Sequence, residues 1–413
     1  MKGDDMRKLL LSASLCALCA AYAHGAFTKR IAFTTSGYDG DSALANFPVL
    51  VKLPGTIQGF DYADFGGTTN LVFKDSAGSV IPHEVDTWTT AGTSLVWVRV
   101  PLVTKTTVFH MYYCGSDDTA NTPAAVWTAA NYVGVWHMDE ASGTVADATG
   151  HGLTATPMGD ASVSVRYSGT DAPIGHARQT GTSSAKGYLT IADNNLLDVG
   201  DTFTMSGWVY FTDIQSGNAE RIFSRKAVYS DQNGWEIEMN AGSDNAFSAR
   251  GSHKDNGKSG GGAAGCTGNF RPSLKNKWTH VALVYNGTQL TVCSNGYEIA
   301  TGTISAVKDN DNNLSIGCNA TGTQAGYFHG YFDECRLLDA VASAEWIAAE
   351  YATVASATFV TAGDVEEIVG KSGAVIFVRL VYLRIRGSIP RNNCSTSAFL
   401  LYFRRHHKKG RYK

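Results

Sequence analysis

WTHVALVYNGTQLTVCSNGYEI, residues 278–299, decides the fold prediction because its turn chemistry leaves the chain little freedom. Side chains of the first run alternate between two faces, with Trp278 and His280 on one and Thr279 on the other, which is the period of a strand. Two Asn-Gly pairs, at 286–287 and 295–296, separate the three runs, and both residue types tolerate the positive φ of tight hairpins. The stretch predicts a three-stranded antiparallel meander. Its first strand is apolar on both faces, as in a two-layer sandwich.

The composition of the 413 residues favours an all-β protein with two or three domains. Hydrophobic residues make up 44% of the chain and charged residues 17%, with 44 glycines, which fits short strands joined by turns. The formal net charge of −3 hides an asymmetry, because no Asp or Glu follows Glu367. The sequence contains neither a phosphate-binding glycine loop nor a serine nucleophile elbow, so nucleotide chemistry and acyl transfer have no support.

Five further stretches surround the meander. They are VGVWHMDEASGTVADATGHGLTATP at 133–157, YLTIAD at 188–193, FTMSGWVYF at 203–211, LSIGCN at 314–319 and GYFDECRLL at 330–338. Taken together with the meander, these motifs resemble a bacterial laminin G-like, concanavalin A-like jelly roll over residues 132–352. Ser343 is placed as the N-cap of a short helical segment with which similar modules end.

The segment before the jelly roll, residues 27–116, reads as strands punctuated by Gly, Pro and Asp turns. Its stretches FPVLVKL, GFDYADF, HEVDTW and VWVRVP resemble an uncharacterised bacterial domain that commonly stands directly before laminin G-like modules. No activity follows from that resemblance. Residues 117–131, polar and alanine-rich with a break at Pro123, predict a linker. We therefore expect an all-β protein, an N-terminal β-sandwich-like domain followed by a jelly-roll β-sandwich, with the two modules folding separately.

Residues 1–26 have the pattern of a secretory signal peptide, in which Lys2, Arg7 and Lys8 precede the apolar run LLLSASLCALCAAYA. That run is too short to be a comfortable membrane span, so no transmembrane segment is expected in the mature chain. A lipoprotein anchor is a weaker alternative, because the residues around Cys19 fit a lipobox poorly. The sequence thus predicts a secreted, cell-surface or periplasmic protein.

The cysteines and the C-terminal segment each leave alternatives open. Export permits disulfides among the six remaining cysteines, and buried free thiols are the alternative. These cysteines are Cys114, Cys266, Cys293, Cys318, Cys335 and Cys394. Residues 353–413 are interpreted as a basic tail, either a truncated or frame-shifted end or a membrane-binding segment. An exported chain makes nucleic acid an unsuitable partner for this basic tail.

The resemblance implies a structural calcium ion between the acidic loop after the first jelly-roll strand and the last strand. Asp147 and Asp333 are the two best ligands by that resemblance, and Asp139 is the third candidate. Calcium requires several hard oxygens, both carboxylate and carbonyl, and glycine-rich loops expose carbonyls readily. The alternative is that Asp139 and Asp147 only organise turns through nearby backbone N–H groups.

Two acidic patterns suggest catalysis at first sight. Glu236 and Glu238 in WEIEMN lie on one face of a strand, about 6.5 to 7 Å apart, as a glycoside hydrolase pair could be. The signature of such enzymes needs a further carboxylate where Asn240 stands, so we expect no catalysis. His83-Glu84 starts a zinc-protease-like pattern, but no second histidine follows one helical turn later. Glu84 and Asp86 are therefore interpreted as structural residues that share one strand face.

Carbohydrate binding is the leading functional prediction. Sugars require aromatic rings that stack on their apolar faces, with amides and carboxylates beside them. The aromatic and imidazole candidates near predicted loops are Tyr229, Trp235, His253, Tyr297 and Tyr327. We therefore expect a non-catalytic protein that binds a glycan or cell-surface polymer. The alternatives are a jelly-roll glycoside hydrolase using Glu236 and Glu238, and an extracytoplasmic sensory or structural portion of a larger biopolymer-transport protein.

Overall fold

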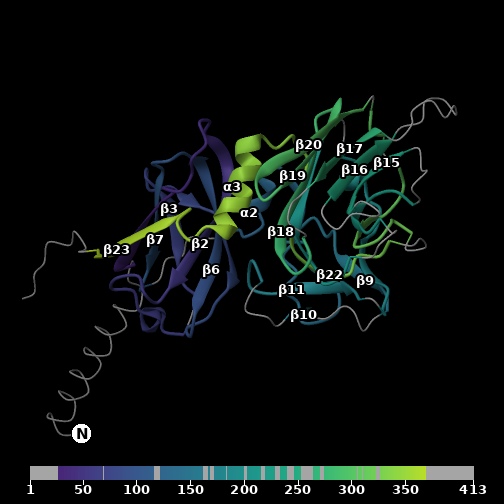
Figure 1. The fold of residues 1–413 in the computed structure, drawn as a ribbon. Helices are drawn as coiled ribbons and strands as arrows, with labels where there is room; N and C mark the ends of the chain where they lie inside the picture. Colours follow the sequence, from purple (N-terminus) through teal and green to yellow (C-terminus); the bar gives the residue numbers. More distant parts are fainter. Residues whose placement is uncertain are drawn as a thin grey trace, which may run out of the picture. The chain divides into compact units, whose positions relative to one another are not determined.

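The computed structural model describes residues 27–368 with internal gaps, and all of them fall in one compact unit (Figure 1). The gaps are 68, 116–120, 161–165, 168–171, 183, 200–201, 215–218, 228–232, 240–245, 253–263, 270–273, 305, 309 and 322–325. Three strands, β10 (Arg166–Tyr167), β16 (Ala246–Ser252) and β17 (Ala264–Asn269), are described by their backbone only. The predicted signal peptide and residues 369–413 of the predicted tail lie outside the described residues.

The N-terminal part is a sandwich of two antiparallel sheets. Sheet A has the order β23-β1-β7-β3-β4, and sheet B has the order β2-β6-β5. The strands are β1 (Lys29–Thr34), β2 (Leu44–Pro54), β3 (Val72–Asp75), β4 (Val80–Ile81), β5 (His83–Thr87), β6 (Thr93–Val103), β7 (Val108–Tyr113) and β23 (Thr361–Glu367), with a 3-10 turn η1 (Tyr62–Phe65). The prediction of short strands over this segment is confirmed.

Sheet B is buried on both faces because β2 and β6 alternate apolar side chains. Val49 of β2 faces Val98 of β6 across the ladder and points into the N-terminal core. Leu50 and Trp97, also paired, point to the opposite face, where they join a second apolar cluster with residues of the jelly roll. The outer face of sheet B therefore packs against the jelly roll.

The prediction that residues 353–413 form a tail is wrong for the residues up to Glu367. The helix α3 (Ala344–Ala355) continues past 353, and β23 then pairs antiparallel with β1 at the edge of sheet A. Val365 lies opposite Ile31 in that pairing. The chain thus returns after the jelly roll to complete the N-terminal sandwich.

The second part is a jelly roll of two larger antiparallel sheets, which confirms the predicted fold class. Sheet C has the order β10-β11-β22-β13-β18-β19-β20, with β8 also paired to β22, and sheet D has the order β17-β16-β15-β14-β21-β12-β9. The remaining strands are β8 (Tyr132–Trp136), β9 (Ala155–Gly159), β11 (Ala177–Gly181), β12 (Gly187–Ile191), β13 (Phe203–Phe211), β14 (Arg221–Ser224), β15 (Gly234–Met239), β18 (Trp278–Tyr285), β19 (Gln289–Ser294), β20 (Tyr297–Thr303), β21 (Leu314–Ile316) and β22 (Gly330–Leu338), and a 3-10 turn η3 (Asn195–Leu197) precedes β13.

The predicted meander is present as β18, β19 and β20, and β18 is buried along almost its whole length between β13 and β19. Its second turn has φ of 47° at Asn295 and 87° at Gly296, as a two-residue hairpin with two left-handed residues requires. The first turn differs. Asn286 keeps a negative φ, and its side-chain oxygen instead accepts from the N–H groups of Thr288 and Gln289.

Two helices lie where the sandwiches meet. The short α2 (Ala125–Thr128) contacts β6 and β8, and α3 contacts β2 and β20; Figure 1 shows α3 between these strands. Ser343 caps α3 as predicted, since its hydroxyl accepts from the N–H of Trp346. Val126 and Trp127, in the predicted linker, are fully buried. The described part of this connector is therefore packed structure, and the prediction that the modules fold separately is not supported by these contacts.

The cysteines and helices bear on two further expectations. Cys114, Cys318 and Cys335 are free thiols, half-buried at Cys114 and buried at the other two, and Cys293 is buried. The side chains of Cys266 and Cys394 lie outside the described residues.

Within the part of the chain that the structure describes, no helix is long and apolar enough to cross a membrane.

Candidate functional site

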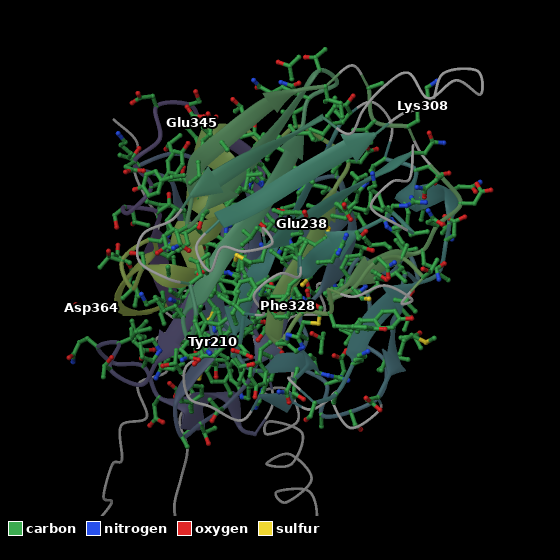
Figure 2. The ribbon with its side chains drawn as sticks, turned by 45° about the vertical axis from the view of Figure 1, so that its right-hand side comes forward. Tyr210, Glu238, Lys308, Phe328, Glu345 and Asp364 are labelled. Carbon is green, nitrogen blue, oxygen red and sulfur yellow. The ribbon has the colours of Figure 1, made fainter. Side chains whose placement is uncertain are left out.

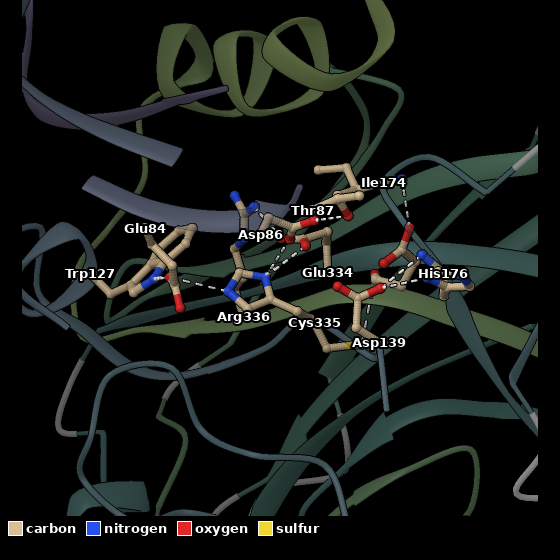
Figure 3. Close-up of polar contacts among 12 residues, drawn as sticks. Glu84, Asp86, Thr87, Trp127, Asp139, Ile174, His176, Glu334, Cys335 and Arg336 are labelled. Carbon is tan, nitrogen blue, oxygen red and sulfur yellow. Dashed lines mark hydrogen bonds and ion pairs between the residues drawn. The ribbon is translucent and has the colours of Figure 1, made fainter. Parts of the chain in front are cut away.

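A cluster of charged side chains lies where β5 of the N-terminal sandwich meets β8 and β22 of the jelly roll (Figure 3). We call it the junction cluster, and its members are Glu84, Asp86, His137, Asp139, Asp333, Glu334 and Arg336. Glu84 and Asp86 do share one strand face, as predicted. That face points at the jelly roll, so the structural interpretation of these two residues missed their partners.

His137 is the centre of the junction cluster. Its Nδ1 lies 2.7 Å from Glu334 Oε1 and 3.7 Å from Asp86 Oδ2, while its Nε2 lies 3.3 Å from Glu84 Oε2. Burial alone would lower the pKa of His137, but the charge of Glu334 and hydrogen bonds to Glu334 and Glu84 outweigh it and raise that pKa well above 6.5. Three carboxylates from two sandwiches therefore converge on one imidazole.

Arg336 fixes the acidic side of the junction cluster. Its Nη2 donates to Glu334 Oε2 at 2.5 Å, and its Nη1 donates to Glu350 Oε1 of α3 at 3.4 Å. The guanidinium carbon lies 4.5 Å from the ring centre of Trp97 and 4.9 Å from that of Trp127. One buried arginine thus joins β22, α3 and the two tryptophans of the contact between the sandwiches.

Asp86 is held in the N-terminal sandwich with one oxygen directed at the jelly roll. Its side chain is fully buried, and Oδ1 accepts from the hydroxyl of Thr87 at 2.9 Å. Oδ2 has no hydrogen-bond partner among the described residues. Burial raises the pKa of Asp86 to about 7, and although the charge of His137 opposes this, the charge of Glu334 adds to it.

Asp139 and Asp333, two of the predicted calcium ligands, lie next to this group. Asp333 Oδ2 accepts from the N–H of Ile174 at 3.0 Å, and its Oδ1 has no partner among the described residues. Asp139 Oδ1 accepts from the N–H of His176 at 2.8 Å. Burial and the charge of Glu334 raise the pKa of Asp333 well above its ordinary value, and Asp139 and Asp86 add to this. Asp139 and Asp333 are thus close enough to interact.

Asp147, one of the two best calcium ligands predicted from the sequence, is occupied by its own loop. Its carboxylate accepts from the N–H groups of Val135, Thr149 and Leu153 at 3.0 to 3.2 Å, and from the hydroxyl of Thr149 at 2.7 Å. This arrangement favours the turn-organising alternative for Asp147, and calcium binding stays a prediction that would rest on Asp139 and Asp333.

Replacing Asp147 by asparagine is expected to destabilise the protein to the same extent with and without calcium. The amide nitrogen of asparagine cannot accept, so at least one donor of the loop loses its partner, at a cost of about 1–3 kcal/mol. Thermal unfolding in millimolar calcium and in excess chelator measures both values. A loss of stability confined to the calcium-loaded protein would contradict this role.

A row of polar side chains crosses the outer face of sheet D. Thr190 of β12 lies opposite Ser315 of β21, Ser315 lies opposite Ser224 of β14, and Ser224 lies opposite Glu236 of β15. Their chain neighbours Leu189, Ile316, Phe223 and Ile237 face the core. The oxygens Thr190 Oγ1, Ser315 Oγ and Glu236 Oε1 are buried and have no hydrogen-bond partner among the described residues. Such atoms call for water or a ligand group as partner.

Glu236 and Glu238 share one arginine on this face. Arg221 Nε lies 3.4 Å from Glu236 Oε2 and 3.6 Å from Glu238 Oε2, and both carboxylates are buried. In Figure 2, which brings sheet D forward, Glu238 lies among the strands of this sheet. The same-face placement predicted for the two glutamates is therefore correct.

Two tyrosines border the polar row. Tyr188 lies two residues before Thr190 on β12, and Tyr327 lies beside it with ring centres 6.2 Å apart. Lys186 Nζ lies 5.7 Å from the centre of the Tyr327 ring. Tyr327 is half-buried and remains a candidate for ring stacking, whereas Tyr188 was missed by the sequence analysis.

The other predicted sugar-binding residues are scattered or unsuitable. Trp235 is wrong as a ligand, because it is 3% exposed and packs against Phe203 in the jelly-roll core. Tyr297 is 74% exposed, but it lies at the start of β20 in sheet C rather than on sheet D. Tyr229 and His253 lie outside the described residues.

One family model matches part of the jelly roll. Residues 182–348 match the laminin G family model of the concanavalin A-like lectin/glucanases superfamily. No curated protein matches the chain.

Solved structures resemble the chain only distantly. The binding domain of Paraclostridial Mosquitocidal Protein 1 is 14% identical, covering 54% of this chain and 52% of that one, with a TM-score of 0.41. The binding domain of botulinum neurotoxin serotype C1 is 13% identical, with coverages of 54% and 52% and a TM-score of 0.39. Domain 4 of AbnA, an extracellular GH43 arabinanase from Geobacillus stearothermophilus solved with arabinotriose, is 17% identical, with coverages of 53% and 97% and a TM-score of 0.37.

The chain spans about half the length of the two toxin binding domains that it resembles. The match to the family model covers the strands from β12 to β22 and the first residues of α3, which the structure shows as one jelly roll. Over residues 182–348 the chain is therefore similar to laminin G-like domains of the concanavalin A-like lectin/glucanases superfamily.

Proposed function

We propose that the chain is a non-catalytic, extracytoplasmic protein that binds a glycan on the outer face of sheet D. The observation that carries this proposal is the half-buried Tyr327, which packs on the buried Tyr188 beside the row of Thr190, Ser315 and Glu236. Tyrosine rings stack on the apolar face of a sugar ring, and hydroxyl and carboxylate oxygens accept from its hydroxyl groups. The three oxygens of the row that have no partner among the described residues supply such acceptors.

The position of this face also suits a binding role. Sheet C is the sheet whose outer residues join the apolar cluster shared with Leu50 and Trp97 of the N-terminal sandwich. The polar row belongs to the opposite sheet, and its members take no part in that cluster. The two sheets of the jelly roll thus have different tasks in the proposal, with sheet C for attachment and sheet D for the ligand.

Hydrolysis is disfavoured by the contacts of the two glutamates. Glycoside hydrolysis needs one carboxyl group protonated, as the acid that assists the leaving oxygen. Both glutamates are instead engaged with one guanidinium, since Arg221 Nε lies 3.4 Å from Glu236 Oε2 and 3.6 Å from Glu238 Oε2. The pair therefore fits a structural or ligand-orienting role.

A binding assay with matched tyrosine variants tests the proposal. Glycan arrays and pull-down on insoluble polysaccharides are used to find a ligand for the purified protein, and titration then gives its dissociation constant. Tyr327→Ala is expected to weaken binding about tenfold, or about 1.4 kcal/mol. Tyr297→Ala, an exposed tyrosine on the other sheet, is expected to leave it unchanged.

Three outcomes would count against the proposal. Binding that depends on Tyr297 and not on Tyr327 would place the site on sheet C. No binding to any glycan class would remove the proposed function. Release of reducing ends by the wild type that is abolished in Glu236→Gln would show that the protein is a hydrolase.

A further inference from the structure

We propose that Asp86, His137 and Glu334 bind a divalent transition-metal ion such as Zn²⁺. This ion would link the N-terminal sandwich to the jelly roll. The three residues each offer one ligand atom, and these atoms lie within 4.8 Å of one another. Asp86 comes from β5, His137 follows β8, and Glu334 is on β22. The proposal is independent of the glycan site on sheet D.

The geometry of the three atoms suits a small ion. His137 Nδ1 is 2.7 Å from Glu334 Oε1 and 3.7 Å from Asp86 Oδ2. Ligand atoms at about 2.0–2.2 Å from a tetrahedral ion are about 3.3–3.6 Å apart, so His137 Nδ1 and Glu334 Oε1 would have to separate by about 0.6–0.9 Å to admit the ion. One imidazole nitrogen with two carboxylate oxygens favours Zn²⁺ or Mn²⁺ over Ca²⁺, which prefers six to eight oxygens.

Each of the three proposed ligand side chains is already held in position by a hydrogen bond or an ion pair. The second nitrogen of His137 lies 3.3 Å from Glu84 Oε2, and that oxygen accepts from Trp127 Nε1 at 2.5 Å. The second oxygen of Glu334 accepts from Arg336 at 2.5 Å. Figure 3 draws the surrounding residues Glu84, Trp127, Glu334 and Arg336. A carboxylate on the far nitrogen of a histidine is the usual outer partner of a metal-binding imidazole.

An independent observation points to a missing partner at the same place. Asp86 Oδ2 belongs to a fully buried side chain, faces His137 and has no hydrogen-bond partner among the described residues. Its other oxygen is occupied by Thr87. Buried carboxylate oxygens are normally paired or bound to a metal. A metal ion at this point would give Asp86 that partner.

The test is calorimetric titration of the chelator-treated, untagged protein with ZnCl₂, MnCl₂ and CaCl₂ in parallel. We expect one Zn²⁺ per chain, with weaker Mn²⁺ binding, and a rise in melting temperature that follows occupancy. Asp86→Asn and His137→Gln are expected to abolish this binding, and Glu84→Gln to weaken it by about 10- to 100-fold. Asp213→Asn, which alters an exposed carboxylate paired with Lys275, is the matched control and is expected to bind as the wild type does.

The outcomes separate this proposal from its alternatives. Absence of stoichiometric Zn²⁺ or Mn²⁺ binding by the folded wild type overturns it, as does Zn²⁺ binding that persists in both Asp86→Asn and His137→Gln. A response to Ca²⁺ alone also overturns it and points to the oxygen-rich neighbourhood of Asp139 and Asp333. Circular dichroism shows whether each variant is folded, and Glu84→Gln, which keeps all three ligands, gives a readout if a ligand variant does not fold. Tyr327→Ala is expected to bind zinc normally, so failure of the glycan proposal leaves this result unaffected.

Discussion

Replacing Arg336 by leucine is expected to lower the free energy of unfolding by about 3–5 kcal/mol. Arg336 is 2% exposed and is the cationic partner of both Glu334, at 2.5 Å, and Glu350, at 3.4 Å. Without Arg336, the buried carboxylates of Glu334 and Glu350 lose their cationic partner. Each keeps one other contact, Glu334 with His137 and Glu350 with the hydroxyl of Ser206, so the loss is only partly compensated. The tryptophan rings that Arg336 covers also lose a contact.

Urea unfolding of the wild type and the variant measures this loss. Arg30→Leu is the matched control, because Arg30 forms an equally short pair with Glu366, at 2.6 Å, with side chains 36% and 50% exposed. Exposed pairs contribute about 0–1 kcal/mol, so the control is expected to change little. Equal losses in the two variants would contradict the distinction between the buried and the exposed pair. The double variant Arg336→Leu with Glu350→Leu is expected to recover part of the stability, since it removes one of the two orphaned charges.

Local turn chemistry predicted the centre of the fold correctly. The strand at 278–285 was expected to be apolar on both faces, and β18 is buried between β13 and β19 in sheet C. Such a strand has to lie inside a sandwich, whatever the rest of the chain does. The type of the first turn was not predictable, because Asn286 can either adopt positive φ or use its side chain as an acceptor.

The error at Trp235 could have been avoided with the same period-two argument. Glu236 and Glu238 were correctly placed on one face of the strand, which puts Trp235 and Ile237 on the other face. A strand of a sandwich has one face toward the core, and the apolar residues occupy it. The tryptophan was therefore a core residue by pattern, although its ring type suits sugar binding.

The junction cluster could not be assembled from sequence, because its parts lie far apart in the chain. Glu84 and His137 are 53 residues apart, and His137 and Glu334 are 197 residues apart. Only the docking of sheet B against sheet C brings them together. The one local signal was a pair of carboxylates on a single strand face at HEVDTW, which predicts a polar partner surface without saying which one.

The strand β23 was missed for a different reason. Its sequence TAGDVEE is polar, and most of its side chains are exposed, so it lacks the apolar alternation that marks a strand. It is an edge strand that gains its order from β1, whose residues are more than 300 positions earlier. Pairing over such a separation leaves no trace in a local pattern.

Lowering the pH is expected to destabilise the protein through His280, a member of the strand β18. His280 is 1% exposed, and burial together with the charge of Arg336 lowers its pKa to about 3. Between about pH 6.5 and pH 3 the unfolded chain therefore binds a proton at this residue that the folded protein does not. The contribution to stability is complete above pH 6.5 and is lost as the pH falls, by about 3 kcal/mol at pH 4.

The comparison of wild type with His280→Gln isolates this contribution, because other titrating groups act in both proteins. The groups that face His280 are Arg336 on β22 and Glu350 on α3, whose Oε1 lies 4.0 Å from His280 Nε2. Burial raises the pKa of Glu350, so its own titration has the opposite sign and appears in both curves. Unfolding free energies are measured by urea at intervals from pH 7 to pH 4, and the wild type is expected to show the steeper loss. Parallel curves would mean that His280 takes up its proton in the folded state, with Glu350 as its partner. They would contradict the prediction that burial and the charge of Arg336 lower the pKa of His280.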